Sequence, residues 1–122
     1  MIKTKLRIIH NAREAAGRLV GQALPAAVSF RVAKLINALN DELIAYEAER
    51  VKLCKKCGTL NKDEGRYDIT KGDEFERELE SLYNLDITLG VEKVALPDNI
   101  AITPKDIINL SEFIMIEGVT DD

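Results

Sequence analysis

The sequence predicts an α+β fold, in which a long central helix forms a helical hairpin and is joined by a shorter acidic helix, a C-terminal helix and a small antiparallel sheet. Three observations predict this class: an amphipathic helical pattern over residues 25–57, a second and acidic one from residue 73, and short stretches where apolar and polar residues alternate. The 122 residues, 46% of them apolar and 31% charged, suit a single domain spanning residues 1–122.

The predicted long helix carries an apolar stripe. Its members follow one another in steps of three or four residues and so share one face: Val28, Val32, Leu35, Leu39, Leu43 and Tyr46. Pro25 suits the first turn, and Gly58 suits a left-handed residue that ends the helix. The helix would be roughly 50 Å long, more than the diameter of a compact domain of this size. The stripe therefore needs a cover, and we expect a partner protein to bind part of it: Val32, Leu35, Leu39, Leu43 and Tyr46.

The segments on either side of the long helix have weaker patterns. Residues 1–24 predict a basic strand over Ile2–Ile9, whose apolar end could equally start a helix, and then a short helix that Asn11 and Glu14 cap and that ends near Leu24. Residues 58–72 are polar and predict a loop with a short strand at Arg66–Ile69.

The last part of the chain, residues 73–118, predicts two helices with strands between them. The acidic helix spans residues 73–84, and the alternation over residues 85–96 is typical of one or two strands. Thr103, Pro104 and Asp106 form a helix start, which predicts a terminal helix that runs through Met115 and ends at Gly118. Residues 119–122 are expected to be a frayed tail.

The charge is unevenly distributed along the chain. The net charge is −4, but residues 1–34 hold seven basic residues against one acidic residue, whereas the remainder holds ten basic and twenty acidic residues. This asymmetry could steer self-association or attract a charged partner. Alternatively, the basic segment folds back onto the acidic half of its own chain.

The sequence also gives an expectation about location. No segment approaches eighteen consecutive apolar residues, and lysine and arginine interrupt the N-terminal stretch where a signal peptide would have its apolar region. We therefore expect a cytoplasmic protein that does not bind membranes. In that reducing compartment its two cysteines would be free thiols.

The strongest chemical motif is the pair Cys54 and Cys57 followed by Gly58, which matches half of a zinc knuckle. Tetrahedral zinc needs two further ligands, and His10 with Asp63, or a second copy of the chain, could supply them. The alternative is structural: the two thiols finish the long helix, with Cys54 facing inward. A redox pair normally stands at the start of a helix, whereas this pair stands at the end.

Catalytic patterns are missing from the sequence. His10 is the only histidine, no G-x-S-x-G motif accompanies it, and the glycines form neither a P-loop nor a dinucleotide-binding motif. The acidic run after residue 72 is typical of a solvated helix face. We do not expect nucleic-acid binding by Lys3, Lys5 and Arg7, because the chain is acidic overall and has only 5% aromatic residues. We therefore expect no enzymatic activity and no cofactor.

Several features of the long helix resemble a family of small phage and prophage proteins of unknown function. These are Leu24-Pro25, the segment Arg31–Lys34, and the tyrosine-glutamate-x-x-arginine segment from Tyr46 to Arg50. In that family a charged loop, a glutamate-rich helix, an acidic-apolar strand region and a short terminal helix follow, as they do here. The family carries a non-cysteine pair at the positions of Cys54 and Cys57. The resemblance implies a phage-related accessory role and supplies no catalytic residue.

The sequence thus predicts a non-enzymatic, phage-related accessory protein that binds another phage or host protein, or itself, during virion or tail assembly. It would reside in the host cytoplasm or on the virion. One alternative is an inhibitor of a host defence enzyme that acts through its acidic surface. Another is a zinc-stabilised regulatory module that uses Cys54 and Cys57.

Overall fold

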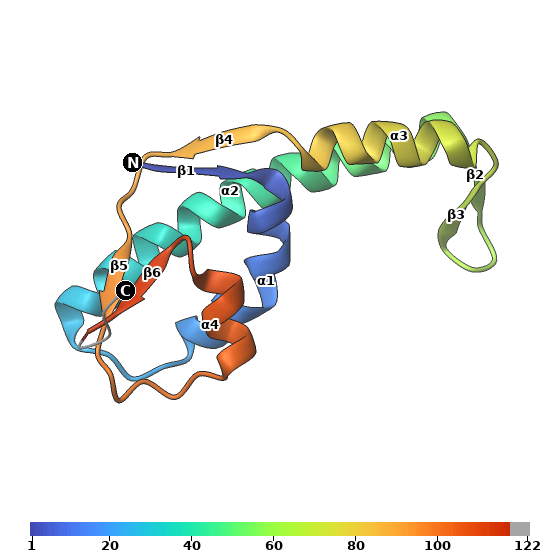
Figure 1. Ribbon diagram of the computed structural model, residues 1–122. Helices are drawn as coiled ribbons and strands as arrows, with labels where there is room; N and C mark the ends of the chain where they lie inside the picture. Colours follow the sequence, from blue (N-terminus) through green and yellow to red (C-terminus); the bar gives the residue numbers. More distant parts are fainter. Residues whose placement is uncertain (118–122) are drawn as a thin grey trace.

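One helix runs through the whole molecule in the computed structural model, which describes residues 1–117 (Figure 1). This helix, α2 (Ala26–Cys57), is unbroken for 32 residues, so the predicted continuous helix is confirmed. It begins directly after Pro25, whose carbonyl accepts the first helical hydrogen bond from the Ser29 N–H at 2.8 Å. At its usual rise per residue, α2 is about 48 Å long. The remaining elements pack along it in two groups, which we call the head and the arm.

The head surrounds the N-terminal half of α2 and contains the main hydrophobic core (Figure 1). Two helices lie there, α1 (Leu6–Val20) and α4 (Pro104–Leu110), and they pack on each other. Its strands are β1 (Ile2–Lys5), β4 (Asp86–Leu89), β5 (Val94–Leu96) and β6 (Ile114–Ile116). Its most deeply buried apolar side chains are Ile9, Leu19, Leu35, Leu39, Leu96, Leu110 and Phe113.

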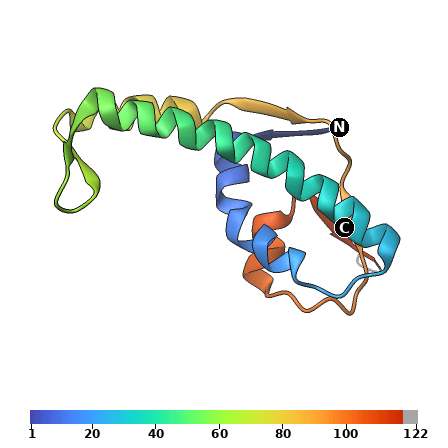
Figure 2. The same ribbon diagram turned by 180° about the vertical axis from the view of Figure 1, so that it is seen from behind.

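The arm is the C-terminal half of α2 together with α3 (Gly72–Tyr83), which runs back beside it (Figures 1 and 2). A hairpin of β2 (Gly58–Asn61) and β3 (Arg66–Ile69) closes its tip. No residue of α3 is buried. Lys56 of α2 pairs with Glu74 at 3.3 Å and with Glu78 at 3.0 Å, so ion pairs as well as apolar contacts hold the two helices together.

The strands form three separate two-stranded sheets. β1 pairs with β4 and β2 pairs with β3, both antiparallel, while β5 and β6 run parallel. The α+β class with a long central helix is therefore confirmed, and the predicted antiparallel sheet exists as two distinct pairs. The alternation over residues 85–96 gives two strands, β4 and β5, because the chain turns at Gly90 between them.

Several predicted boundaries were wrong. The first strand ends at Lys5, and α1 begins at Leu6 instead of Asn11, because Leu6 and Ile9 bury on the same face as Ala12 and Ala16. The alternative, that the apolar end of Ile2–Ile9 starts a helix, is thus the correct one. The helix ends at Val20, before the predicted Leu24. The short strand predicted at Arg66–Ile69 is confirmed as β3, and β2 is the strand that the predicted loop over residues 58–72 missed.

The predicted terminal helix is also too long. α4 ends at Leu110, because Phe113 enters the core and the next residues pair with β5 as β6, from Ile114 to Ile116. Gly118, the predicted end of that helix, and the predicted tail 119–122 lie outside the described residues.

The basic N-terminal segment pairs with the acidic half of its own chain, as the second of the two charge hypotheses predicted. Lys5 Nζ lies 2.8 Å from Asp86 Oδ1. The other pairs are Arg7 with Glu80, Arg18 with Asp106, and the Met1 amino group with Glu92. Three of the seven basic side chains of residues 1–34 are thus paired with acidic residues of the later part of the chain.

Gly58 does not end α2 in a left-handed conformation. Its φ of −150° is extended, and it starts β2 directly. Glycine is needed there for a different reason, since a Cβ would lie 2.6 Å from the carbonyl oxygen of Asp68 and 3.1 Å from that of Cys54. The tip hairpin thus depends on a close backbone approach.

We expect Gly58→Ala to lower the free energy of unfolding by about 1–3 kcal/mol, because backbone atoms must move to admit the methyl group. Urea denaturation followed by circular dichroism measures this. Gly17→Ala is the matched control: a Cβ there meets nothing within 4 Å, and alanine inside α1 should stabilise the protein by about 0.5–1 kcal/mol. Equal stability of the two variants would contradict the close-approach explanation.

Candidate binding site

The residues predicted to bind a partner are covered by the chain itself. Val32, Leu35 and Leu39 are at most 4% exposed and lie in the head core, where α1 and β5 cover α2. Leu43 is half-buried against the same core, and Tyr46 is buried at the base of the arm. These five side chains are core residues, so the prediction that they form a docking surface was wrong. The stripe needed a cover, and the folded chain supplies it.

Tyr46 belongs to an aromatic cluster where the arm leaves the head. Its hydroxyl lies 2.7 Å from that of Tyr83 on α3, and the His10 ring lies 5.1 Å from the Tyr46 ring. Burial and the Tyr83 hydrogen bond raise the pKa of Tyr46. Burial, with the nearby Arg13 charge, lowers the pKa of His10. His10 thus joins α1 to both helices of the arm, and its role here is to hold the two parts together.

Cys54 and Cys57 are buried thiols at the end of α2. Arg50 Nη1 lies 3.7 Å from Cys54 Sγ. Burial raises the pKa of Cys57, which opposes the thiolate form that metals bind. Within residues 1–117, no three histidine, cysteine, aspartate or glutamate side chains gather closely enough to hold a metal ion. The position of the pair agrees with the structural alternative, in which Cys54 faces inward.

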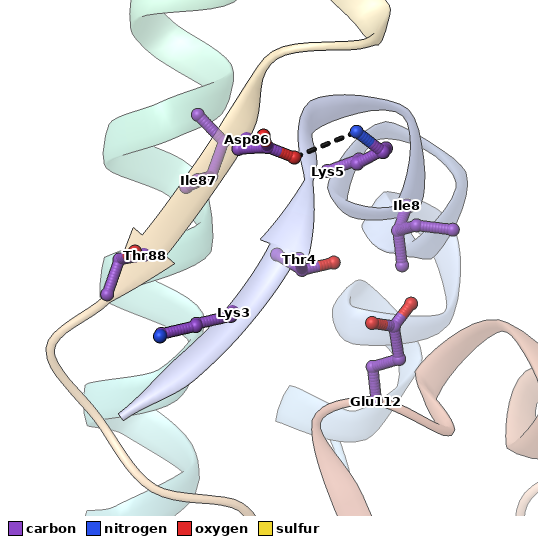
Figure 3. Close-up of a pocket in the computed structure, with 8 residues that line it drawn as sticks. All are labelled: Lys3, Thr4, Lys5, Ile8, Asp86, Ile87, Thr88 and Glu112. Atoms are coloured by element: carbon purple, nitrogen blue, oxygen red, sulfur yellow. Dashed lines mark hydrogen bonds and ion pairs between the residues drawn. The ribbon is translucent and has the colours of Figure 1, made fainter.

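A groove runs along β1, as shown in Figure 3. It holds about 630 Å³, and its walls come from β1, β4, Ile8 of α1 and Glu112 in the turn before β6. A second cavity of about 470 Å³ shares Lys3 and Glu112 with it and continues toward Met115 of β6. We call these two cavities together the β1 groove.

One edge of β1 is unpaired along this groove. Residues on an antiparallel strand alternate between pointing their main-chain groups at the partner strand and pointing them away. The Leu6 N–H donates to the Leu85 carbonyl at 3.1 Å. The main-chain N–H and C=O groups of Thr4, two residues earlier, therefore also point toward β4. Lys3 and Lys5 therefore direct their main-chain N–H groups away from β4. No other strand of residues 1–117 pairs with that edge.

Thr4 and Glu112 face each other across the groove. Figure 3 shows the Thr4 side chain and the Glu112 carboxylate both pointing into the space beside Ile8, while the Lys3 side chain projects from the opposite side of the strand. Thr4 is only 8% exposed, and its Oγ1 is the one buried side-chain N or O atom among residues 1–117 without a hydrogen-bond partner. A buried hydroxyl in this state costs free energy unless something binds it.

The carboxylates that line the groove differ in their partners. Asp86 pairs with Lys5, and Glu92 pairs with the Met1 amino group. Glu112 is half-buried and takes part in no ion pair of residues 1–117. The groove therefore brings together one carboxylate without an ion-pair partner among residues 1–117, one buried hydroxyl without a hydrogen-bond partner and one open strand edge.

Comparison of the chain with known protein families, with curated proteins and with solved structures gave no match. None of the helices of residues 1–117 is long and apolar enough to cross a membrane.

Sequence reasoning missed the β1 groove. One signal was available: Thr4 stands between Ile2 and Leu6 on the inward face of the first strand, so it is a polar residue at a core position. Glu112 gave no signal, because the sequence placed it inside the terminal helix, where a glutamate is ordinary.

Proposed function

We propose that this protein is a non-enzymatic accessory protein of phage origin, which works in the host cytoplasm by binding another protein during virion or tail assembly. The observation that carries the binding role is the β1 groove, where an open strand edge, a buried unpaired hydroxyl and an unneutralised carboxylate lie together. Groups of this kind are satisfied when a second chain covers them. The phage origin is supported by the resemblance of residues 24–53 and the elements after them to small phage proteins.

The alternative of an inhibitor with an acidic surface has less support. Three acidic residues of α3 are engaged within the chain, since Glu74 and Glu78 pair with Lys56 and Glu80 pairs with Arg7. A protein that competes with nucleic acid for a basic groove needs carboxylates that remain available. The α3 surface would offer only part of its charge to such a partner.

The test places a photo-crosslinking amino acid at Lys3, in the groove, or at Asn37, on the exposed face of α2. Both variants are produced in cells in which the phage replicates, and mass spectrometry identifies the crosslinked proteins. We expect a crosslink from Lys3, but not from Asn37, to one structural or assembly protein of the phage. A nuclease of the host as the crosslinked protein would favour the inhibitor. The absence of a specific crosslink from several exposed positions on the head and arm would contradict a binding role.

A further inference from the structure

The open edge of β1 has the features of a site for one more strand. An added strand lies about 4.8 Å from its neighbour and pairs with N–H and C=O groups that point sideways. Lys3 offers both of these groups and Lys5 offers its N–H, while the carbonyl of Lys5 stands at the start of α1. The β1 groove is lined by residues along the whole length of this strand, from Ile2 to Lys5.

The side chains on the edge restrict what can pair with it. Lys3 and Lys5 are exposed charges on a strand of four residues, and lysines on short edge strands discourage indiscriminate pairing between chains. A segment that pairs here must therefore gain something beyond backbone hydrogen bonds. Glu112, whose half-buried carboxylate faces the groove, is the group that can supply this gain.

Glu112 determines the charge of the incoming segment. A strand laid along β1 would cover the half-buried carboxylate and remove part of its hydration, which is unfavourable unless a cation joins it. The other carboxylates of the groove already have cations, Lys5 for Asp86 and the Met1 amino group for Glu92. Lys3 and Lys93 line the same groove but form no ion pair with Glu112, so a basic residue of the segment can supply the cation that Glu112 lacks.

We propose that an extended segment of the partner protein binds along β1 as a third strand, with a lysine or arginine side chain that pairs with Glu112. The segment has no proline at the positions that pair with β1, since each pairing needs an amide N–H or a regular strand conformation. This inference rests on the proposed protein-binding function and adds its mode and the chemistry of the partner.

The probe is a displayed library of random 12-residue peptides, selected on the immobilised full chain. We expect the selected peptides to share a basic residue and to lack proline around it. The best peptide is then synthesised, and its affinity is measured by titration calorimetry. The absence of any enriched peptide, or enrichment of peptides without a basic residue, would overturn the proposal.

A matched pair of variants tests the backbone pairing. Lys3→Pro removes an N–H that points away from β4, so the β1–β4 pairing is kept, whereas Lys3→Ala removes the same side chain and keeps the N–H. Loss of one buried hydrogen bond should weaken peptide binding about tenfold in Lys3→Pro, and Lys3→Ala should stay within about twofold of the unmodified protein. Equal affinities of the two variants would contradict strand addition. If Lys3→Pro does not fold, peptides with single N-methylated amides test the same hydrogen bond without changing the protein.

Two further variants test the side chains. Glu112→Gln should weaken binding about tenfold, and neutralising the basic residue of the peptide should then cost little more, as expected for groups that act on each other. Thr4→Val should make the free protein more stable to urea, because it removes a buried hydroxyl without a partner, and should leave peptide binding within about twofold. A loss of affinity as large as that of Glu112→Gln would contradict the assignment of the specific contact to Glu112.

Two other results would separate this inference from the proposed function. If light scattering shows a dimer that Lys3→Pro dissociates, the groove binds a second copy of the chain, and the partner segment proposed here is wrong. If the photo-crosslinks to a phage protein come from the arm and not from Lys3, protein binding stands as the function while the groove proposal fails.

Discussion

Replacing Phe113 by alanine is expected to lower the free energy of unfolding by about 3–5 kcal/mol, the usual cost of removing a fully buried aromatic side chain. Phe113 has no exposed surface and lies in the head core, between α4 and β6. Its main chain is also engaged, since its carbonyl accepts from the Val94 N–H at 3.0 Å and its N–H donates to the Leu110 carbonyl at 2.8 Å. The cavity left by the ring would loosen the turn that sets both α4 and β6. Urea denaturation followed by circular dichroism is the measurement.

Phe30→Ala is the control for this prediction. Phe30 is 62% exposed on α2 and makes one contact with the Lys34 ammonium group, 5.2 Å from the ring centre. Removing it should change the free energy of unfolding by no more than about 0.5 kcal/mol. Comparable losses in the two variants would mean that the head core is not packed as described.

The second large effect is expected at the ion pair between α1 and α4. Arg18 donates two hydrogen bonds to Asp106, one of them from Nε at 2.9 Å, and Asp106 is only 1% exposed. Arg18→Met keeps the apolar stem of the side chain and leaves the buried carboxylate without its cation. At pH 7 we expect a loss of about 2–4 kcal/mol in the free energy of unfolding, because the guanidinium no longer compensates the buried charge.

The pair of Arg18 and Asp106 also makes the free energy of unfolding depend on pH. The hydrogen bonds from Arg18 hold the pKa of Asp106 below its usual range, against the opposing effect of burial. A carboxyl group whose pKa is lowered by folding stabilises the protein above its unfolded-state pKa of about 4, and this contribution is lost as the pH falls through the lower pKa of the folded state. The difference between the unmodified protein and Arg18→Met should therefore shrink below about pH 4. A difference that stays constant from pH 7 to pH 3 would show that packing of the arginine stem is the cause. Lys105→Met, an exposed lysine on α4, is the control and should change little at either pH.

The parts of the fold that depend on local pattern could be predicted from the sequence. The long helix follows from its stripe of apolar residues, and the start of α4 follows from Thr103, whose hydroxyl accepts a hydrogen bond from the Asp106 N–H at 3.2 Å. The strand region after the acidic helix was also predicted, because apolar and polar residues alternate from Leu85 to Leu89 as they do in half-buried strands.

The parts that depend on contacts between distant residues could not be predicted. The segment Ile114–Ile116 has a helical pattern, but it forms β6 because β5, twenty residues earlier, pairs with it. Gly58 looks like a left-handed helix end and instead makes room for the Asp68 carbonyl on the opposite strand. In both places a tertiary contact overrides the local preference.

The same limit explains why the candidate site was misplaced. The apolar stripe of α2 predicts a partner protein over part of its length because the sequence does not show how much of the chain returns to cover it. The β1 groove brings together residues more than one hundred positions apart, Thr4 and Glu112, and no local pattern can reveal such a meeting.

The chain leaves the head at Tyr46 and returns to it at Tyr83, and the hydroxyl groups of these two residues are 2.7 Å apart. Residues 47–82, which form the arm, thus begin and end at the same place on the head. Shortening or lengthening the arm by equal numbers of helical turns in α2 and α3 would leave the head and the two ends of the arm in place. The reach of the molecule can therefore change by genetic deletion or duplication while its scaffold is preserved.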